Sequence, residues 1–368
     1  APGLRLEATA ATATPAGVGR LQVALPVAAA REGAHVRVLA EVWGRDARGM
    51  EVPVAWIGGM TPVAGGHLAL GLDERWIARA GARAPFELRA LRIEDPDHFI
   101  PLATAARLPL ALPSQRGRAT ATTAAAAGPV DETMRMGPRP ARMEMAVAAT
   151  GSKLLLVHGY CSAGVWPQSQ FANAATFLDA HQNRSHDQFA LRLRDFGAQW
   201  NSFGTVAHSQ GGAAALHLYS YYWSGLDNAG AGRLMQSVGT PYQGTNLAGI
   251  IATIGNWFGV ACGSNSNMTY SGAQAWLAGI PAWARAKVNY YTTAFRSTNW
   301  WTNDYCHAAS DLVLSDPEDG TVERDYAQLP GATNRGHVTG QCHTAGMRDP
   351  AQYQDAARNA TMSANAAR

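Results

Sequence analysis

The chain has little charge and no long apolar run. Only 15% of its 368 residues are Asp, Glu, Lys or Arg and 47% are hydrophobic, which favours a large buried core over disorder. The net charge is only +3 and no Lys/Arg run occurs, so nucleic acid is not an expected partner. No apolar stretch is long enough to predict a transmembrane segment. No signal peptide begins at Ala1, which fits a cytosolic chain or a mature secreted one.

Cysteines are few, and none of them forms a C-x-x-C pair, so a zinc site is not expected. The four are Cys161, Cys262, Cys306 and Cys342. Their even number and the scarcity of lysine favour two disulfides and an oxidising, extracellular compartment over four reduced thiols. The cysteine pattern therefore predicts a secreted protein.

Residues 1–113 show the alternation of apolar and polar residues that is typical of strands. In "HVRVLAEVW", for example, Val36, Val38, Ala40 and Val42 share one face. Further strands are expected in "RLQVALP", "EVPVAWIG" (with Val52, Val54 and Trp56 on one face), "FELRALRI" and "ARLPLALP". Frequent Gly, Pro and Asp between them indicate an all-β, immunoglobulin-like sandwich. No catalytic cluster occurs in this stretch, so we expect a structural or targeting module.

Residues 114–150 are rich first in Ala and Thr and then in Arg, Met and Pro, without a sustained period. This composition predicts a linker. From residue 151 to 368, apolar runs alternate with helical patterns, which predicts a mostly parallel sheet flanked by helices. Strands are expected in "KLLLVHGY", "SFGTVAHS", "RLMQSVGTPYQGT" and "AKVNYYTTAF", and helices in "SQFANAATFLDAHQ" and "QGGAAALHLYSYYW".

Ser209 lies between the second of these strands and the helix that follows it. Such a sharp turn needs small neighbours, and "AHSQGG" supplies Ala207, Gly211 and Gly212 in an A-x-S-x-G variant of the G-x-S-x-G nucleophile motif. A serine before glycines can also be an ordinary helix cap. The order of strand, turn and helix favours a nucleophile.

With this motif, the chain resembles the α/β-hydrolase superfamily and, more narrowly, bacterial secreted lipases and esterases. "LLLVHGYCSAG" is similar to the lipase strand before the oxyanion hole, and "GTPYQGTNLAG" to a Thr-Pro-His-x-Gly turn with Tyr242 in place of histidine. "EDGTVE" is similar to the turn that carries the acid of the triad. "VHGYCSAGVWP" and "QCHTAGM" also resemble conditioned-medium-factor-like bacterial proteins. The resemblance covers residues 153–353, not the N-terminal domain.

The resemblance implies the order serine, acid, histidine. We predict Asp319 as the acid because it lies in an Asp-Gly turn, with Asp311 in "ASDLVL" as the alternative. We predict His343 as the base because it lies nearer the final segment, with His337 as the alternative.

The same resemblance implies an oxyanion hole formed by the backbone N–H groups of Tyr160 and Gln210. On this fold the loops that carry Cys161 and Cys342 meet at one edge of the sheet, so these two could pair and leave Cys262 to Cys306. Other pairings stay open. Residues 246–286 occupy the place of a lipase lid, and their apolar side chains fit either a lid or the core. The apolar residues of this insertion are Ile250, Ile251, Trp257, Phe258, Trp276, Leu277 and Trp283.

The sequence thus predicts a secreted serine hydrolase that cleaves carboxylic esters through a Ser-His-Asp triad and an acyl-enzyme, acting on a lipid or another ester. Alternatives are a polyester (polyhydroxyalkanoate) depolymerase and a catalytically silent hydrolase-fold protein of adhesion or signalling. No cofactor and no catalytic metal are expected. A structural calcium, as in related lipases, could use Asp316 or Asp325.

Overall fold

We describe the fold from a computed structural model of the chain. It describes residues 3–29, 31–113, 126–131, 134, 149–181, 183–246, 262–296, 310, 313–346 and 348–368. Contacts divide the chain into two compact units, Ala1–Ala141 and Arg142–Arg368, and each is described by itself.

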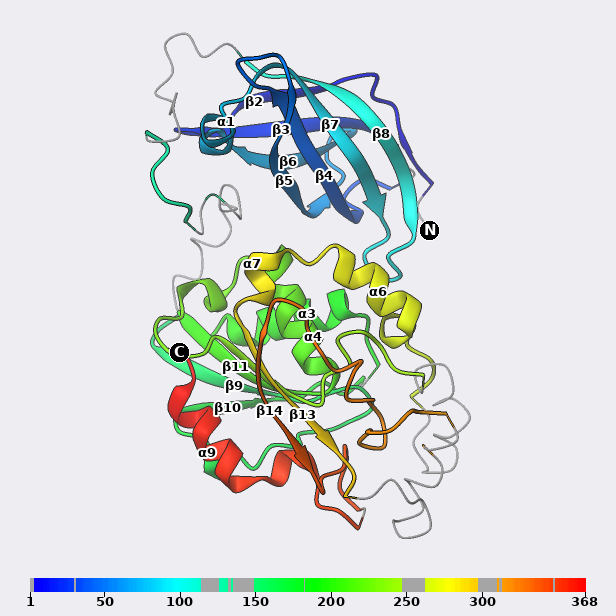
Figure 1. The fold of residues 1–368 in the computed structure, drawn as a ribbon, viewed down its shortest axis with the longest axis vertical. Helices are drawn as coiled ribbons and strands as arrows, with labels where there is room; N and C mark the ends of the chain where they lie inside the picture. Colours follow the sequence, from blue (N-terminus) through cyan, green and yellow to red (C-terminus); the bar gives the residue numbers. More distant parts are fainter. Residues whose placement is uncertain are drawn as a thin grey trace. The chain divides into compact units, whose positions relative to one another are not determined.

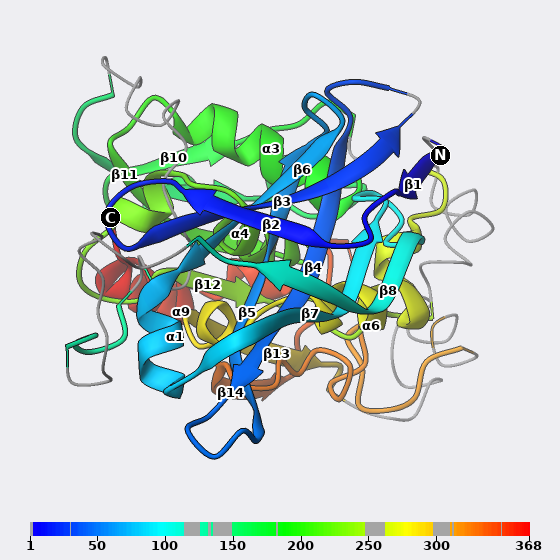
Figure 2. The ribbon, with the colours of Figure 1, turned by 90° about the horizontal axis from the view of Figure 1, so that it is seen from above.

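The first unit is built almost entirely of strands, and Figure 2 shows it from above. Among the described residues the strands pair in the order β1-β3-β2-β8-β7-β4-β5, and β6 pairs with β3. All of these pairs are antiparallel except β2 with β8. The elements are β1 (Leu4–Leu6), β2 (Ala11–Pro15), β3 (Arg20–Ala29), β4 (His35–Arg45), β5 (Glu51–Pro62), β6 (His67–Asp73), α1 (Glu74–Ala80), β7 (Arg83–Glu94) and β8 (Pro101–Ala111).

The predicted inward face of β4 is confirmed, because Val36, Val38, Ala40 and Val42 are all buried. On β5 the prediction is wrong in part. Trp56 is 40% exposed. The register between β4 and β5 shifts after Val42, as at a β-bulge. Such a shift breaks the simple alternation of faces along a strand.

Part of the predicted linker packs on α1. Arg75 Nη1 lies 2.8 Å from Asp131 Oδ2, and Trp76 Nε1 donates a 2.7 Å hydrogen bond to the carbonyl of Met134. Arg79 donates to the carbonyl of Gly128. These contacts lie within the first unit, so residues 126–131 and 134 belong with the β domain.

The second unit contains a parallel sheet, as the sequence predicts. Its strands, among the described residues, follow the order β10-β9-β11-β12-β13-β14, and every pair is parallel. Figure 1 shows α3 and α4 on one face of the sheet and α9 on the other. The strands are β9 (Ser152–Val157), β10 (Ala174–Phe177), β11 (Ser202–His208), β12 (Met235–Val238), β13 (Val288–Ala294) and β14 (Thr333–Thr339). The helices are α3 (His186–Gly197), α4 (Gln210–Tyr221), α6 (Tyr270–Ala278), α7 (Ala282–Arg285) and α9 (Ala356–Asn365), with short 3-10 turns η2 (Gln168–Gln170), η3 (Gly225–Asn228), η4 (Ser266–Met268) and η6 (Gln352–Gln354).

The helix predicted in "SQFANAATFLDAHQ" is wrong. Part of this stretch is the edge strand β10, which pairs with β9 from Ala174 opposite Leu154 to Phe177 opposite Val157. The tertiary pairing overrides the helical propensity of its alanines. The helix of this region is α3, which begins with a capping box: Ser185 caps the N–H of Gln188, and the Gln188 side chain accepts from the Ser185 N–H.

Candidate active site

Ser209 occupies a strained turn between β11 and α4. Its backbone has φ 52° and ψ −133°, a conformation that non-glycine residues rarely adopt. Two hydrogen bonds hold it: the Ser209 N–H donates to the carbonyl of Val238 (3.1 Å), and Thr240 Oγ1 donates to the carbonyl of Ser209 (2.7 Å). Ser209 does not act as a side-chain cap of α4. The ordinary helix-cap interpretation therefore fails, and the role of Ser209 as a nucleophile stays a prediction.

Glycines surround the turn because there is no room for side chains. A Cβ atom on Gly159 would lie 2.5 Å from Ser209 Cβ, and one on Gly211 would lie 2.3 Å from the carbonyl oxygen of His158. A Cβ on Gly212 would lie 2.2 Å from Thr240 Oγ1. The backbone of the loop after β9 is thus in direct contact with the first turn of α4 beside Ser209.

Asp319 and His343 form a buried pair. Asp319 Oδ2 lies 3.0 Å from His343 Nδ1, and the two residues are only 1% and 5% exposed. The other carboxylate oxygen, Oδ1, accepts from the N–H groups of Thr321 (3.1 Å) and Val322 (2.8 Å). The His343 N–H donates to the carbonyl of Asp319 at 2.7 Å. This arrangement favours the tautomer with Nδ1–H toward the carboxylate and the lone pair on Nε2.

The Asp319–His343 pair contacts the strand that leads to Ser209, at His208, the residue before the serine. The rings of His208 and His343 lie 4.6 Å apart between centroids. Burial, and secondarily the neighbouring His343, lowers the pKa of His208 well below its ordinary value, so this ring is neutral at pH 7. The sequence did not predict the residue between the two rings, Gln352, which is fully buried and contacts both of them.

The alternative residues lie elsewhere. His337 is on β14, where its Nδ1 lies 2.9 Å from Thr292 Oγ1. Desolvation lowers its pKa, and the charge of Arg324 lowers it further. Asp311 lies outside the described residues. Of the predicted acid and base residues that the structure describes, Asp319 and His343 are the two brought together, and their catalytic role stays a prediction.

Of the predicted oxyanion residues, Gln210 follows Ser209 in the chain, and Tyr160 follows Gly159, whose backbone approaches Ser209 closely. Gln210 is the first residue of α4, so its N–H is one of the helix-start donors that have no acceptor within the helix. The Gln210 side chain is fixed by a 2.7 Å hydrogen bond that Nε2 donates to the carbonyl of Arg184. The Tyr160 hydroxyl donates to the carbonyl of Gly263. The use of these two N–H groups as an oxyanion hole stays a prediction.

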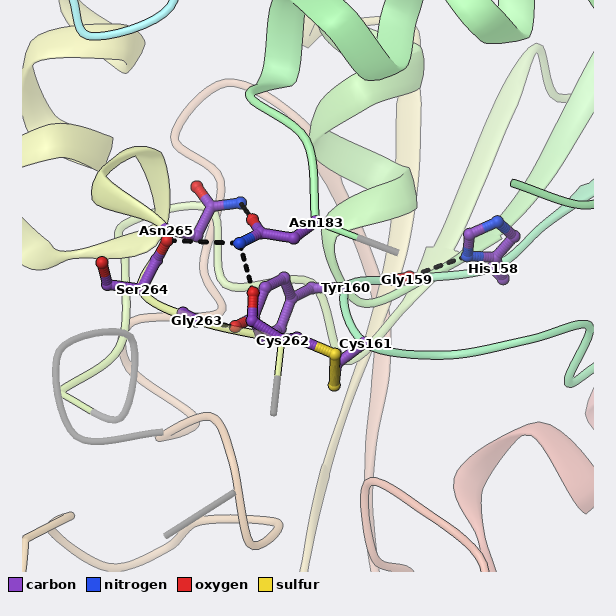
Figure 3. Close-up of a disulfide and its surroundings, with 9 residues drawn as sticks. All are labelled: His158, Gly159, Tyr160, Cys161, Asn183, Cys262, Gly263, Ser264 and Asn265. Carbon is purple, nitrogen blue, oxygen red and sulfur yellow. Dashed lines mark hydrogen bonds between the residues drawn. A yellow bond between two sulfur atoms is a disulfide. The ribbon is translucent and has the colours of Figure 1, made fainter. Parts of the chain in front are cut away.

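A disulfide joins Cys161 to Cys262 next to this loop, with the two Cα atoms 5.7 Å apart (Figure 3). The predicted pairs Cys161–Cys342 and Cys262–Cys306 are therefore both wrong. Cys342 is buried, and Cys306 lies outside the described residues. Asn183 Nδ2 donates to the carbonyl of Cys262 on the same side. The loop that follows β9 is thus covalently tied to the segment that leads into α6.

This geometry can be compared with known proteins. A family model described as the conditioned medium factor C-terminal domain matches residues 149–366. The chain belongs to the conditioned medium factor family. The family's model of a third Ig-like domain matches residues 37–138, which supports the predicted immunoglobulin-like domain. The conditioned medium factor of Dictyostelium discoideum is 42% identical over 344 residues, or 90% of this chain and 49% of the relative, so the chain spans about half the length of that curated relative.

Solved structures resemble this chain only distantly. A mature lipase of Bacillus licheniformis is 18% identical, with 51% of this chain and 83% of the lipase covered and a TM-score of 0.36. A metagenomic carboxyl esterase is 17% identical, with 59% and 71% covered and a TM-score of 0.41.

Of the two alternatives for the insertion, Trp276 fits the core, because its side chain is fully buried in the second unit. Its Nε1 donates a 3.0 Å hydrogen bond to His217 Nδ1, and its ring packs edge-on against His186. His217 Nε2 in turn lies 3.0 Å from Asp187 Oδ1. Trp276 therefore belongs to the core. Ile250, Ile251, Trp257 and Phe258 lie outside the described residues.

No metal centre emerges from the described part of the chain, where no group of three or more His, Cys, Asp or Glu side chains is placed to hold an ion. A calcium ion at Asp316 or Asp325 stays a prediction. No helix within the described residues is long and apolar enough to cross a membrane.

Proposed function

We propose that the C-terminal unit has the α/β-hydrolase fold and is a serine hydrolase of carboxylic esters. The observation that carries this proposal is the strained turn at Ser209, in the same unit as a buried Asp319–His343 pair whose ring contacts that of His208. An ordinary serine needs neither the strain nor the acid–base pair. A nucleophile explains why the chain keeps a strained backbone at Ser209 and buries an acid–base pair in the same unit.

In this mechanism His343 Nε2 removes the proton from Ser209 Oγ as the oxygen attacks the ester carbonyl. Asp319 holds the ring by its Nδ1–H and stabilises the imidazolium that forms. The N–H groups of Tyr160 and Gln210 bind the oxyanion, each contributing about 3 kcal/mol to the barrier reduction. His343 then protonates the departing alcohol. In the second half, His343 removes a proton from water as the water attacks the acyl-enzyme, and it returns this proton to Ser209 Oγ as the acid product leaves.

The substrate class is a carboxylic ester, either a lipid or a polyester. Location outside the cell is supported by the Cys161–Cys262 disulfide and by the relative's name, which refers to conditioned medium. A second candidate is a silent hydrolase-fold protein of adhesion or signalling, in which the turn at Ser209 is kept but no ester is cleaved.

A fluorophosphonate probe decides between the two candidates. We expect stoichiometric covalent labelling of the wild type at Ser209 and no labelling of Ser209→Ala, with Ser202→Ala as the matched control on the same strand. Turnover of a soluble p-nitrophenyl ester should fall at least about 10³-fold in Ser209→Ala. An unlabelled, folded wild type would favour the silent candidate. Clearing of a polyester film, compared with hydrolysis of emulsified triglyceride, separates the two ester classes.

A further inference from the structure

Gln352 is a fully buried amide placed between two histidine rings and a hydroxyl. Its Nε2 lies 2.9 Å from His208 Nε2 and 3.0 Å from His343 Nδ1, and its Oε1 lies 2.6 Å from Thr293 Oγ1. Gly239, with φ 61°, makes the space, since a Cβ there would lie 2.2 Å from Gln352 Nε2. The position of this side chain is therefore closely defined.

The backbone of Gln352 is fixed as firmly. Its N–H donates to the carbonyl of Cys342 (2.8 Å), one residue before His343, and its own carbonyl accepts from Arg358. The amide oxygen and nitrogen have nearly the same shape, so which of them faces the rings is decided by hydrogen-bonding partners.

The orientation with Nε2 toward the rings gives poor hydrogen bonding. His208 Nε2 and His343 Nδ1 must then both accept. The single N–H of neutral His208 moves to Nδ1, which is buried and has no hydrogen-bond partner among the described residues. His343 Nδ1 would also turn a lone pair toward Asp319 Oδ2, 3.0 Å away, although a carboxylate only accepts.

Turning the amide over restores the bond from His343 Nδ1–H to Asp319 and gives the N–H of His208 an acceptor. Oε1 then accepts from His208 Nε2–H and from His343 Nδ1–H, which it shares with Asp319. Nε2 donates to Thr293 Oγ1, and the Thr293 hydroxyl donates to Asp319 Oδ2, 3.3 Å away. The second N–H of Gln352 and the lone pair of His208 Nδ1 are then left without a partner among the described residues, a cost similar to that of an unpaired His208 Nδ1–H, so the intact bond from His343 Nδ1–H to Asp319 decides for the turned amide. We propose that Gln352 presents its carbonyl oxygen to both rings and is a positioning residue for the catalytic His343.

This role rests on the proposed function. A second acceptor at Nδ1 holds the His343 ring in the tautomer that leaves Nε2 free for Ser209 and stabilises the imidazolium. The other titratable groups close to the two rings are Asp319 beside His343, and Tyr353, Arg358 and His158 around His208. Gln352 adds a neutral acceptor to this set.

The orientation can be read without turnover. Histidine nitrogen NMR on Ser209→Ala protein should show His208 with its proton on Nε2 and His343 with its proton on Nδ1 at neutral pH. In Ser209→Ala/Gln352→Leu, His343 should gain its second proton at a pH lower by about one unit, because an acceptor of the charged ring is lost. A proton on Nδ1 of His208, or a rise or no change in that pH, overturns the proposal.

Turnover tests the positioning role. In Gln352→Leu with Ser209 intact, the acid limb of kcat/KM should move in the same direction and kcat should fall about tenfold, with KM nearly unchanged. Gln352→Glu, which keeps an oxygen toward the rings, should retain more activity than Gln352→Leu. Gln354→Leu, an exposed change in the same turn, is the control for folding. An unchanged acid limb and kcat in folded Gln352→Leu overturns the role. A wild type without any esterase activity counts against the proposed function, while the NMR result still decides the orientation.

Discussion

Replacing Cys161 and Cys262 together by serine is expected to destabilise the second unit strongly. The bridge spans 101 residues of sequence. In the chain-entropy model, opening a loop of about that length frees the unfolded chain by about 4.7 kcal/mol. Folded-state contacts persist around the bridge, including the Asn183 bond to the Cys262 carbonyl and the Tyr160 bond to Gly263. We therefore expect a net loss of about 3–5 kcal/mol in the free energy of unfolding.

Guanidinium denaturation followed by far-UV circular dichroism measures this loss. The helical signal reports mainly on the second unit, because α1, with seven residues, is the one helix longer than a single turn described in the first. The m-value should rise, since the unfolded variant is less compact. Ser162→Ala, a change in the same loop, is the control. A loss below about 1 kcal/mol would show that the entropic account of this bridge is wrong.

Further expectations concern the acid, the helix start, the core and pH. Asp319→Asn should lower kcat by about 10⁴-fold, whereas exposed Asp325→Asn should leave it unchanged in the same ester assay. Gly211→Ala should cost about 1–3 kcal/mol in thermal unfolding and reduce activity, because its Cβ meets the His158 carbonyl. Trp276→Ala should cost about 3–5 kcal/mol without altering acyl-chain preference; a selective loss on long chains would restore a lid role. Burial raises the pKa of Glu318 from 4.5 to about 8. Its folded pKa is therefore above its unfolded one, so this group's stabilisation is full below about pH 4.5 and is lost as pH rises to about 8. In Glu318→Gln, the free energy of unfolding from urea titrations should change less between about pH 4.5 and pH 8 than in the wild type. An unchanged pH dependence would refute the buried, protonated carboxyl.

The sequence predicted the residues whose chemistry leaves a local mark. Small residues lie two positions before and after Ser209, at Ala207 and Gly211, because its turn is crowded. Asp319 is followed by a glycine in a tight turn. Both constraints act between near neighbours in the chain, so they are visible in short motifs. The order of the three groups left His337 and His343 open, and nearness to the final segment favoured His343.

Gln352 and the disulfide could not be predicted in this way. The contacts of Gln352 with His208 and Thr293 join distant parts of the sequence, and a lone glutamine has no spacing that signals such a contact. The partner of Cys161 depends on how the segment before α6 returns to the loop after β9, which cysteine counting leaves open. The strand β10 was missed for a related reason: its pairing with β9 outweighs its own propensity.

The crowding around Ser209 gives a rule for judging other members of the family. Gly159, Gly211 and Gly212 each occupy a position where even one methyl group would lie within 2.5 Å of a neighbouring atom. A relative that keeps the serine but carries a larger residue at one of these places cannot hold the same turn without moving the start of its helix. These glycines are required by the turn and not by the chemistry. Their presence in a relative therefore indicates that the turn has been kept, even where the acid or the histidine has been lost.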